Sequence, residues 1–203
     1  MNKKTSLRIL AASDLHDSKS AVEKLAKKAL EEKVDLVILA GDIHSYHEGT
    51  KNFLTPLIKT KKKILFIPGN CDTRIEHEQL RKEAKSIHGY YVTYGGVGIA
   101  GIGSPDWTLQ HDDIDFLIIK QQMEKMKPKK KILVSHLHAA GTIAEKMGRF
   151  TGWTGDEVLR YAVEKFQPDI LISGHIHEAE GIEEKIGKTK VFQVGKRGKI
   201  IEL

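Results

Sequence analysis

The stretch that decides the fold is LRILAASDLH, residues 7–16, in which a largely apolar run ends in Asp14-Leu15-His16. Its first part, Leu7 to Ala12, is a strand candidate, and four similar runs follow it along the chain. Amphipathic helical segments alternate with such runs, and this alternation is typical of an α/β protein with much parallel sheet. The other strand candidates are Val34 to Ala40, Lys63 to Ile67, Lys131 to Ser135 and Asp169 to Ser173.

Three segments between the strand candidates have apolar residues at helical spacing. The first is expected to form a capping box from Ser20 and Glu23, and the third is expected to begin at Thr154 with Glu157 as its box partner. The second stops before Pro128, which cannot continue a helix. We interpret the apolar face of each helix as part of the core. The first face consists of Val22, Leu25, Ala26, Ala29 and Leu30, the second of Phe116, Ile119, Met123 and Met126, and the third of Val158, Ala162 and Phe166.

Shorter strand candidates lie outside this alternation. Tyr90 to Thr93 and Val97 to Gly101 are separated by Tyr94-Gly95-Gly96 and resemble a hairpin. Val191 to Val194 and Lys199 to Leu203 are expected to be closing strands, so the sheet content is mixed. With 203 residues and no linker-like stretch, residues 1–203 are expected to form a single domain.

Composition narrows the class of protein. An apolar fraction of 40% excludes a disordered chain. Cys71 is the only cysteine, so no intramolecular disulfide can form and a cytoplasmic location is expected. The apolar run after Arg8 is too short for a signal peptide, and no run approaches the length of a membrane span, so neither export nor a membrane partner is expected.

The net charge of +6 is compatible with a nucleic-acid partner or with a lysine-rich solvated surface. The two densest basic runs, Lys61 to Lys63 and Lys129 to Lys131, come immediately before strand candidates. They are therefore expected at the opposite ends of those strands from the polar residues that follow the strands. We favour a solvated surface for both runs, so nucleic acid is a possible partner that is not favoured.

Side chains with metal-binding chemistry follow each of the five main strand candidates. In a largely parallel sheet, the segments after the carboxyl ends of the strands share one edge, where open α/β sheets place their sites. Imidazole and carboxylate groups suit divalent transition metals, and an Asn amide oxygen binds a metal without adding charge. In chain order the segments are Asp14-Leu15-His16, Gly41-Asp42, Gly69-Asn70-Cys71-Asp72, His136 and Gly174-His175-Ile176-His177.

Each segment alone is a weak signal, because a lone His or an Asp-x-His after a strand is usually structural. Their order and common placement are what indicate a metal site. Two carboxylates, four imidazoles and one amide exceed the roughly four ligands of one tetrahedral zinc, so two ions sharing a bridging carboxylate are expected. His175 and His177, two residues apart on an extended segment, diverge and can serve different ions. Gly41, Gly69 and Gly174 are expected to turn the chain sharply off its strands.

The ordered motifs between Leu10 and His177 resemble those of the calcineurin-like metallophosphoesterase family, which are Asp-x-His, Gly-Asp, Gly-Asn-His-Asp or Glu, a His, and Gly-His-x-His. The resemblance implies the metallophosphoesterase fold, a four-layer α/β/β/α sandwich in which helices flank two mixed β-sheets. It also implies a dinuclear metal centre. We expect two divalent transition-metal ions, manganese first, with iron, nickel, zinc or cobalt as alternatives.

Carried over motif by motif, the resemblance places one ion on Asp14, His16 and His177. Asn70, His136 and His175 would hold the other ion, and Asp42 would bridge the two. His138 is an alternative to His136 for the fourth motif, but His136 directly follows the apolar run, as the family's His does. The catalytic candidates are Asp42, Asn70, His136 and His138.

The sequence departs from the family pattern at Cys71, where many members have a His thought to protonate the leaving group. Small bacterial and archaeal members resemble this chain in having Gly-Asn-Cys-Asp. Cys71 is either a vacated acid position or a small apolar filler behind Asn70. His138 is either a replacement acid or a surface histidine. Asp72 either orients a metal-binding imidazole or forms a turn or helix cap.

These features predict a phosphoesterase that cleaves phosphodiesters, with phosphomonoesters as a second possibility, by in-line attack of a metal-bridging hydroxide. The substrate would be a small phosphoester or a nucleotide, and the oligomeric state is not predicted. A nuclease and a non-catalytic interaction module on the same fold are the alternatives. The nuclease is disfavoured because the sequence lacks a basic track interleaved with aromatic residues.

Two segments could wall the substrate pocket, because both follow strand candidates. One is residues 101–113, and the other is a long loop expected over residues 139–153. Arg74 and Arg149 are candidates for contacts with the phosphate. The other candidate wall residues are Trp107, His111, Phe150 and Trp153.

Overall fold

The computed structural model of the protein describes residues 6–45 and 52–203, so the predicted domain of residues 1–203 extends beyond the described residues. The first half of the chain contains β1 (Arg8–Ala12), α1 (Lys19–Glu31), β2 (Leu36–Ala40), α2 (Thr55–Lys59), β3 (Lys63–Ile67), α3 (Arg74–Leu80), β4 (Lys85–Ser86), β5 (Tyr91–Tyr94) and β6 (Val97–Ile102). The second half contains α4 (Asp113–Lys125), β7 (Lys130–Ser135), α5 (Ile143–Gly148), η1 (Arg149–Thr151), α6 (Glu157–Phe166), β8 (Ile170–Ser173), η2 (His177–Ala179), β9 (Glu183–Ile186), β10 (Thr189–Gln193) and β11 (Lys199–Glu202).

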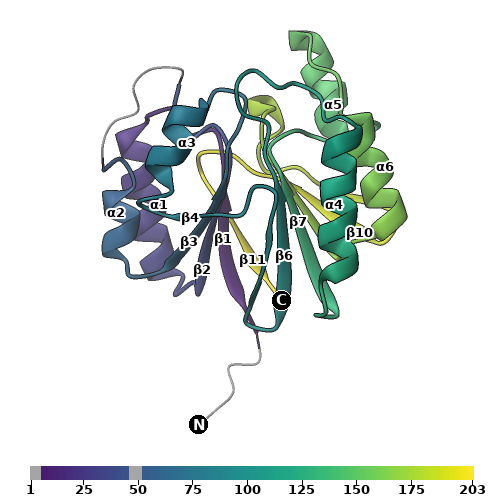
Figure 1. The fold of residues 1–203 in the computed structure, drawn as a ribbon. Coiled ribbons are helices and arrows are strands. Elements are labelled where there is room, and N and C mark those ends of the chain that lie inside the picture. The colour runs from purple at the N-terminus through teal and green to yellow at the C-terminus, as the bar shows by residue number, and fades with distance from the viewer. Residues whose placement is uncertain (1–5, 46–51) are drawn as a thin grey trace.

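Two β-sheets stack face to face between two layers of helices (Figure 1). The first sheet has the strand order β11-β1-β2-β3-β4, and the second has the order β5-β6-β7-β8-β10-β9. The central strands are parallel, while β11, β5 and β9 are antiparallel strands at sheet edges. The expected four-layer α/β/β/α sandwich with two mixed sheets is confirmed.

The central strands are apolar along their whole length because both of their faces are covered. Side chains alternate between the faces of a strand, so in β2 Leu36, Ile38 and Ala40 face the other sheet, while Val37 and Leu39 face helices. Helices α1 and α2 cover the first sheet, and α4 and α6 cover the second (Figure 1). The space between the sheets is thereby filled with aliphatic side chains, which hold the two sheets in one arrangement.

This packing brings the ends of distant strands together at one edge of the sandwich. After β1 and β2, the Asp14 backbone N–H donates to the carbonyl of Gly41 at 3.0 Å. After β7 and β8, the Gly174 N–H donates to the carbonyl of His136, also at 3.0 Å. A third hydrogen bond crosses between the sheets, from the His175 N–H to the Asp14 carboxylate at 3.2 Å. The predicted shared edge is therefore present.

Two predicted helix starts are wrong by two residues. Helix α1 is capped by Ser18, whose side chain accepts from the Ala21 N–H, and not by Ser20. Helix α6 is capped by Asp156, and Thr154 lies before the cap. Several short polar residues precede each helix, and any of them satisfies the pattern on which the prediction relied. Leu30 also departs from its predicted apolar face, since it is 55% exposed.

Several short elements were not predicted. Strands β4 and β9 and helices α2, α3 and α5 are each seven residues or shorter, which is too short for periodicity to be visible in the sequence. Helix α5 and η1 occupy much of the segment 139–153, which was expected to be a loop. The predicted hairpin is present as β5 and β6. In the part of the chain that the structure describes, no helix is long and apolar enough to cross a membrane.

Candidate metal centre

One cluster of donor atoms is formed by residues that follow β1 and β8. The Nε2 atoms of His16 and His177 lie 3.2 Å apart. Nε2 of His177 lies 3.5 Å from Oδ1 of Asp14. These three side chains offer donor atoms that all lie within 4.8 Å of one another, a spacing that a single cation can bridge.

A second cluster is centred on the amide oxygen of Asn70. This oxygen lies 2.9 Å from Nε2 of His136 and 2.9 Å from Nδ1 of His175. Nδ1 of His136 lies 2.9 Å from the carbonyl oxygen of Ala40, which can only accept, so Nδ1 carries a proton. In the neutral ring, Nε2 then points its lone pair at the Asn70 oxygen. Lone pairs that face one another in this way fit a bound cation.

Asp42 lies between the two clusters and offers one carboxylate oxygen to each. Oδ1 is 3.4 Å from Nε2 of His136, and Oδ2 is 3.6 Å from Nε2 of His16. The Cys71 backbone N–H donates to Oδ1 at 2.8 Å and fixes the orientation of the carboxylate. All seven residues predicted as ligands therefore lie together, with Asp42 in the central position.

Four of these residues have a left-handed backbone, which non-glycine residues adopt rarely and at an energetic cost. The φ angles are 55° at Asp14, 45° at His16, 50° at Asp42 and 74° at His175. Such conformations persist where the surrounding structure enforces them, and they aim these four side chains at the shared edge. Strain of this kind is typical of functional sites.

The predicted role of the glycines is confirmed only in part. Gly41 has a φ of 90° and turns the chain as expected. Gly69 is required for space instead, because a Cβ atom there would lie 2.2 Å from Oδ1 of Asp42. Gly174 is similarly close to Ser13, with a Cβ atom 2.6 Å from the hydroxyl oxygen. Neither of these two has a left-handed backbone.

The buried charges of the centre are strongly coupled. Burial disfavours the charged form of His136, but the Asp42 carboxylate outweighs it and raises the pKa of His136 to about 9. Burial opposes ionisation of Asp42 too, yet His136 holds the pKa of Asp42 below its usual range. Burial, reinforced by His136, lowers the pKa of His175 to about 3. A divalent cation bound between Asp42 and His136 would take the place of the proton that they hold.

The residues that hold these side chains in place were missed in the sequence. The hydroxyl of Ser45 lies 3.2 Å from Nδ1 of His16. The carboxylate of Asp17 accepts from the Ser45 N–H at 2.9 Å and lies 2.6 Å from Nδ1 of His44. These contacts join segments that are distant in the chain, so the sequence does not show them. The only signal in the sequence is that the residues lie close to the Asp-x-His and Gly-Asp motifs.

Asp72 is fully buried and ties two of the loops together. Its carboxylate accepts from the backbone N–H groups of Gly69 at 2.9 Å, Ile43 at 3.2 Å and His44 at 2.8 Å. Burial and the nearby charge of Asp42 raise the pKa of Asp72 to about 7. Its hydrogen bonds match neither predicted role, because they go to backbone amides of the loops that carry Asp42 and Asn70, and Thr73 is the residue that caps α3.

Cys71 faces the centre and does not fit the interpretation as a filler behind Asn70. Its sulfur lies together with donor atoms of His16 and Asp42, all within 4.8 Å of one another. The Asn70 amide donates to the sulfur at 3.5 Å. The thiol therefore lies beside donor atoms of the predicted ligands.

The interpretation of His138 as a surface histidine is wrong, since only 2% of it is exposed. Its ring stacks on His175, with an angle of 15° and a centroid distance of 5.8 Å. Among the described residues, neither ring nitrogen has a hydrogen-bond partner. Burial lowers the pKa of His138 to about 4, so the ring is neutral at neutral pH.

Two tryptophans of the predicted wall segments lie next to predicted ligands. The indole of Trp153 lies 4.8 Å from the His175 ring, edge to face. Trp107 donates its backbone N–H to the carbonyl of Asn70 at 3.0 Å, and 63% of it is exposed. His111 is buried, and its ring contacts the side chains of Asp115 and Ser135, so it is not an exposed wall residue.

The remaining wall candidates are exposed. Arg74 forms an ion pair with Asp106 at 2.9 Å, and Arg149 forms one with Glu145, also at 2.9 Å. Phe150 is 94% exposed, more than any other large apolar residue described. The Arg74–Asp106 pair is exposed on both sides and contributes little to stability, whereas Arg149 pairs with a buried carboxylate.

A four-layer sandwich with carboxylate, imidazole and amide donors gathered at one edge defines a metal-binding hydrolytic centre. The model of the calcineurin-like phosphoesterase family matches residues 7–179, and the chain belongs to this family. The protein is therefore a phosphoric ester hydrolase of a family that uses divalent metals.

Known proteins similar to this chain come from archaea, bacteria and animals. The uncharacterized protein MJ1162 of Methanocaldococcus jannaschii is 26% identical over 194 residues, which cover 91% of this chain and 86% of that protein. The crystal structure of TT1561 of Thermus thermophilus matches this chain with a TM-score of 0.73 at 17% identity. The match covers 95% of this chain and 91% of the TT1561 chain. A dimetal phosphatase from Danio rerio has a TM-score of 0.62 at 12% identity, covering 94% and 88%.

Proposed function

We propose that this protein hydrolyses phosphodiesters at a centre of two divalent transition-metal ions, with manganese as the first expectation. The observation that carries this proposal is the placement of Asp42, whose two oxygens face different clusters. Asp14, His16 and His177 would hold one ion, and Asn70, His136 and His175 the other. The likeness in fold to a dimetal phosphatase from Danio rerio is consistent with two ions.

The charge of the loaded centre suits a phosphate group. Bound ions of this kind would polarise the phosphoryl oxygens and generate a nucleophile from water near neutral pH. Two divalent ions would carry four positive charges, and the carboxylates of Asp14 and Asp42 carry two negative charges, so the loaded site would have a net positive charge. The imidazoles add no charge, because a histidine binds a metal ion only in its neutral form.

The site lacks an effective proton donor for the leaving group among the described residues. This favours diesters whose leaving groups do not need a proton. His138 is neutral at neutral pH and is stacked beneath His175, so it does not supply an imidazolium proton. The Cys71 thiol faces the centre but is a weak hydrogen-bond donor. Aryl or cyclic diesters, whose leaving groups need little help, should therefore react faster than alkyl monoesters.

The aromatic walls support a substrate with a flat group beside the phosphate. The backbone of Trp107 lies next to Asn70, and the indole of Trp153 lies next to His175. An indole ring contributes contact area and stacking to a nucleobase or an aryl group. A small phosphoester or a nucleotide therefore fits better than a bare alkyl phosphate. Since Cys71 is the only cysteine, we assign the protein to the cytoplasm.

The test compares the rates of the manganese-loaded protein on bis(4-nitrophenyl) phosphate, 4-nitrophenyl phosphate and an alkyl monoester. We expect the diester to react fastest and the alkyl monoester slowest. His175→Ala should abolish the diester rate, while His77→Ala, which changes a half-buried histidine on α3, should leave it within about twofold of the wild type. Equal loss in both variants, or a faster alkyl monoester, would refute the proposal.

A further inference from the structure

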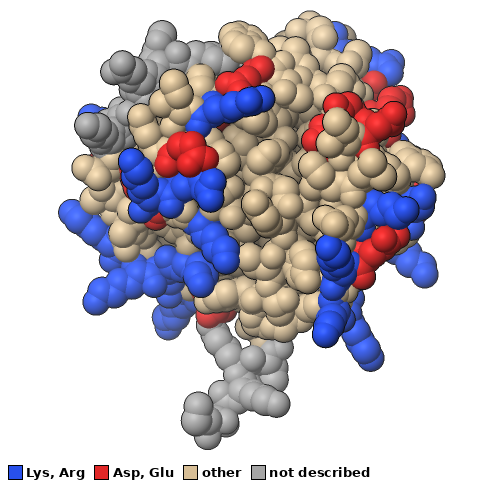
Figure 2. Space-filling model, in the orientation of Figure 1, with Lys and Arg blue, Asp and Glu red and all other residues tan. Residues whose placement is uncertain are grey.

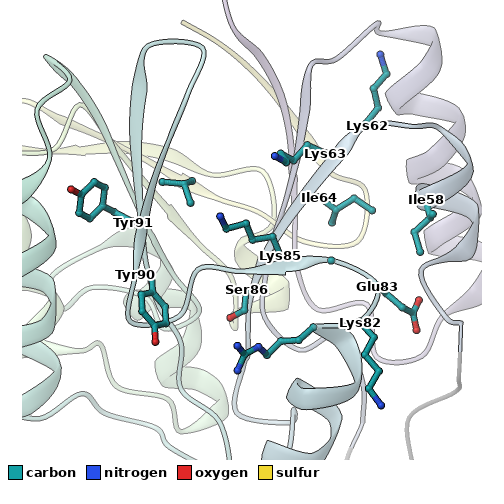
Figure 3. Close-up of a pocket in the computed structure, with 13 residues that line it drawn as sticks. Ile58, Lys62, Lys63, Ile64, Lys82, Glu83, Lys85, Ser86, Tyr90 and Tyr91 are labelled. Atoms are coloured by element: carbon teal, nitrogen blue, oxygen red, sulfur yellow. The ribbon is translucent and has the colours of Figure 1, made fainter.

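A groove of about 670 Å³ lies away from the metal ligands, between the edge strands β4 of the first sheet and β5 of the second. Its walls come from parts of the chain that are distant in sequence. The end of the basic run, Lys62 and Lys63, meets Arg81, Lys82 and Lys85 from the segment around β4. Tyr90 and Tyr91 line the other side (Figure 3).

The fold therefore creates what the linear sequence does not show, a basic surface next to exposed aromatic rings. Strands β3 and β4 are parallel neighbours, with Leu65 opposite Lys85, so the basic residues of both strands enter the groove from the same side. In Figure 3, Lys63 and Lys85 extend from these strands toward the gap, and Tyr90 and Tyr91 lie on the segment across it, with the Tyr91 ring pointing away from the lysines. Figure 2 shows Lys and Arg gathered over this region of the surface.

The positive charges of the groove are not neutralised by acidic residues in its lining. Five of its lining residues are cationic and one, Glu83, is acidic. The Glu83 carboxylate accepts from the backbone N–H groups of Asn52 and Leu54, both at 3.0 Å, so it is occupied at the start of α2. Arg81 pairs with Glu78 at 3.0 Å in an exposed, weak ion pair. Within residues 6–45 and 52–203, no ion pair involves the four lysines of the groove.

A second groove on the same protein shows that basic residues alone do not produce this imbalance. It is lined by Lys188, Lys190 and Lys199, together with Lys130, but also by three acidic residues. One of these, Glu183, forms an ion pair with Lys199. Its lysines are therefore partly neutralised and provide a matched control.

The tyrosines indicate which polyanion the groove fits. Tyr90 is 69% exposed and is the ring available to a ligand, while Tyr91 is 38% exposed and its hydroxyl donates to the carbonyl of Lys125 at 3.5 Å, which turns its ring toward the end of α4 (Figure 3). Large exposed rings next to uncompensated cations are the combination that binds single strands, since bases stack on the rings while lysines contact phosphates. An acidic protein segment would use the cations but would gain little from the rings.

We propose that this groove binds single-stranded nucleic acid, and that it does so independently of the metal centre. The contacts would be mainly electrostatic and would not distinguish one base from another, because the described residues that line the groove do not form a set of buried hydrogen-bond donors and acceptors. Its position at the starts of β3 and β4 keeps it away from the loops that carry the ligands, so binding does not require hydrolysis.

The experiment measures the anisotropy of a labelled oligothymidylate with the full chain in EDTA, across a series of salt concentrations. EDTA prevents hydrolysis, so failure of the proposed phosphodiesterase activity would not affect this result. The test variants are Lys63→Glu/Lys85→Glu and Tyr90→Ala. The matched control is Lys188→Glu/Lys190→Glu, which changes the net charge equally. Heparin serves as a polyanion without bases, and sedimentation reports the oligomeric state.

We expect the Lys63/Lys85 variant to lose at least about tenfold in affinity and to lower the salt slope by about 1.4, as removal of two single-strand phosphate contacts predicts. Tyr90→Ala should lose about tenfold for the oligonucleotide and leave heparin binding unchanged. Three results would overturn the proposal: equal loss in the Lys188/Lys190 control, no effect of Tyr90→Ala, or a groove that instead mediates self-association and binds no oligonucleotide.

Discussion

Replacing Asp72 by Ala removes the carboxylate that holds the loops after β2 and β3 together. Three buried backbone N–H groups, those of Gly69, Ile43 and His44, lose their acceptor. At about 1 kcal/mol for each hydrogen bond, the free energy of unfolding should fall by roughly 3 kcal/mol. Asp72→Asn keeps one oxygen and removes the repulsion with Asp42, so it should lose about 1 kcal/mol or less.

Urea denaturation in EDTA, followed by far-UV circular dichroism, measures this difference without a contribution from bound metal. Asp113→Ala, which removes an exposed carboxylate from the first turn of α4, is the control and should change stability by about 0.5 kcal/mol at most. If Asp72→Ala costs less than about 1 kcal/mol, or if Asn is as damaging as Ala, the three hydrogen bonds do not hold the loops together as inferred.

The metal centre and its surroundings give three further predictions. Asp42→Ala should lower activity by about 100-fold or more because it removes an oxygen from both clusters, and activity within about tenfold of the wild type in a steady-state assay would contradict this. Burial lowers the pKa of His88 to about 4 from 6.5, so its contribution to stability is fully present above pH 6.5 and is lost as the pH falls toward 4. His88→Gln should flatten that loss in thermal unfolding of the chelated protein, and an unchanged slope would contradict the assignment. Cys71→His should raise the rate on an alkyl monoester selectively while Cys71→Ala changes little; if Ala abolishes activity with metals still bound, the thiol is not a vacated acid position.

The sequence was sufficient for the layers of the fold and for the residues that meet at its edge. Runs such as those leading to Asp14 and Asp42 are buried on both faces, so their apolar character and the polar motifs that follow them are visible without a structure. Parallel pairing places the ligands at the same end of each sheet, and the packing of the two sheets then brings both groups together. The exact caps, such as Ser18 in place of Ser20, depend on local backbone geometry, which several neighbouring residues could satisfy.

What could not be predicted depends on contacts between distant segments. The role of Asp72 is set by amides of a different loop, and the burial of His138 is set by stacking on His175. The groove beside Tyr90 combines residues from two sheets, so the basic run appeared in the sequence as an isolated lysine cluster. The first two contacts arise when neighbouring strands of one sheet pair, and the groove arises only when the two sheets are packed together.

The most direct measurement is the number of metal ions that the protein binds. The purified chain is stripped with chelator, reconstituted with manganese, freed of excess metal and examined by elemental analysis. Seven ligand residues, one of them shared, give four protein ligands for each ion, so we expect two manganese ions per chain and a loss of bound metal in Asp42→Ala. One ion or none per wild-type chain would contradict a dinuclear centre.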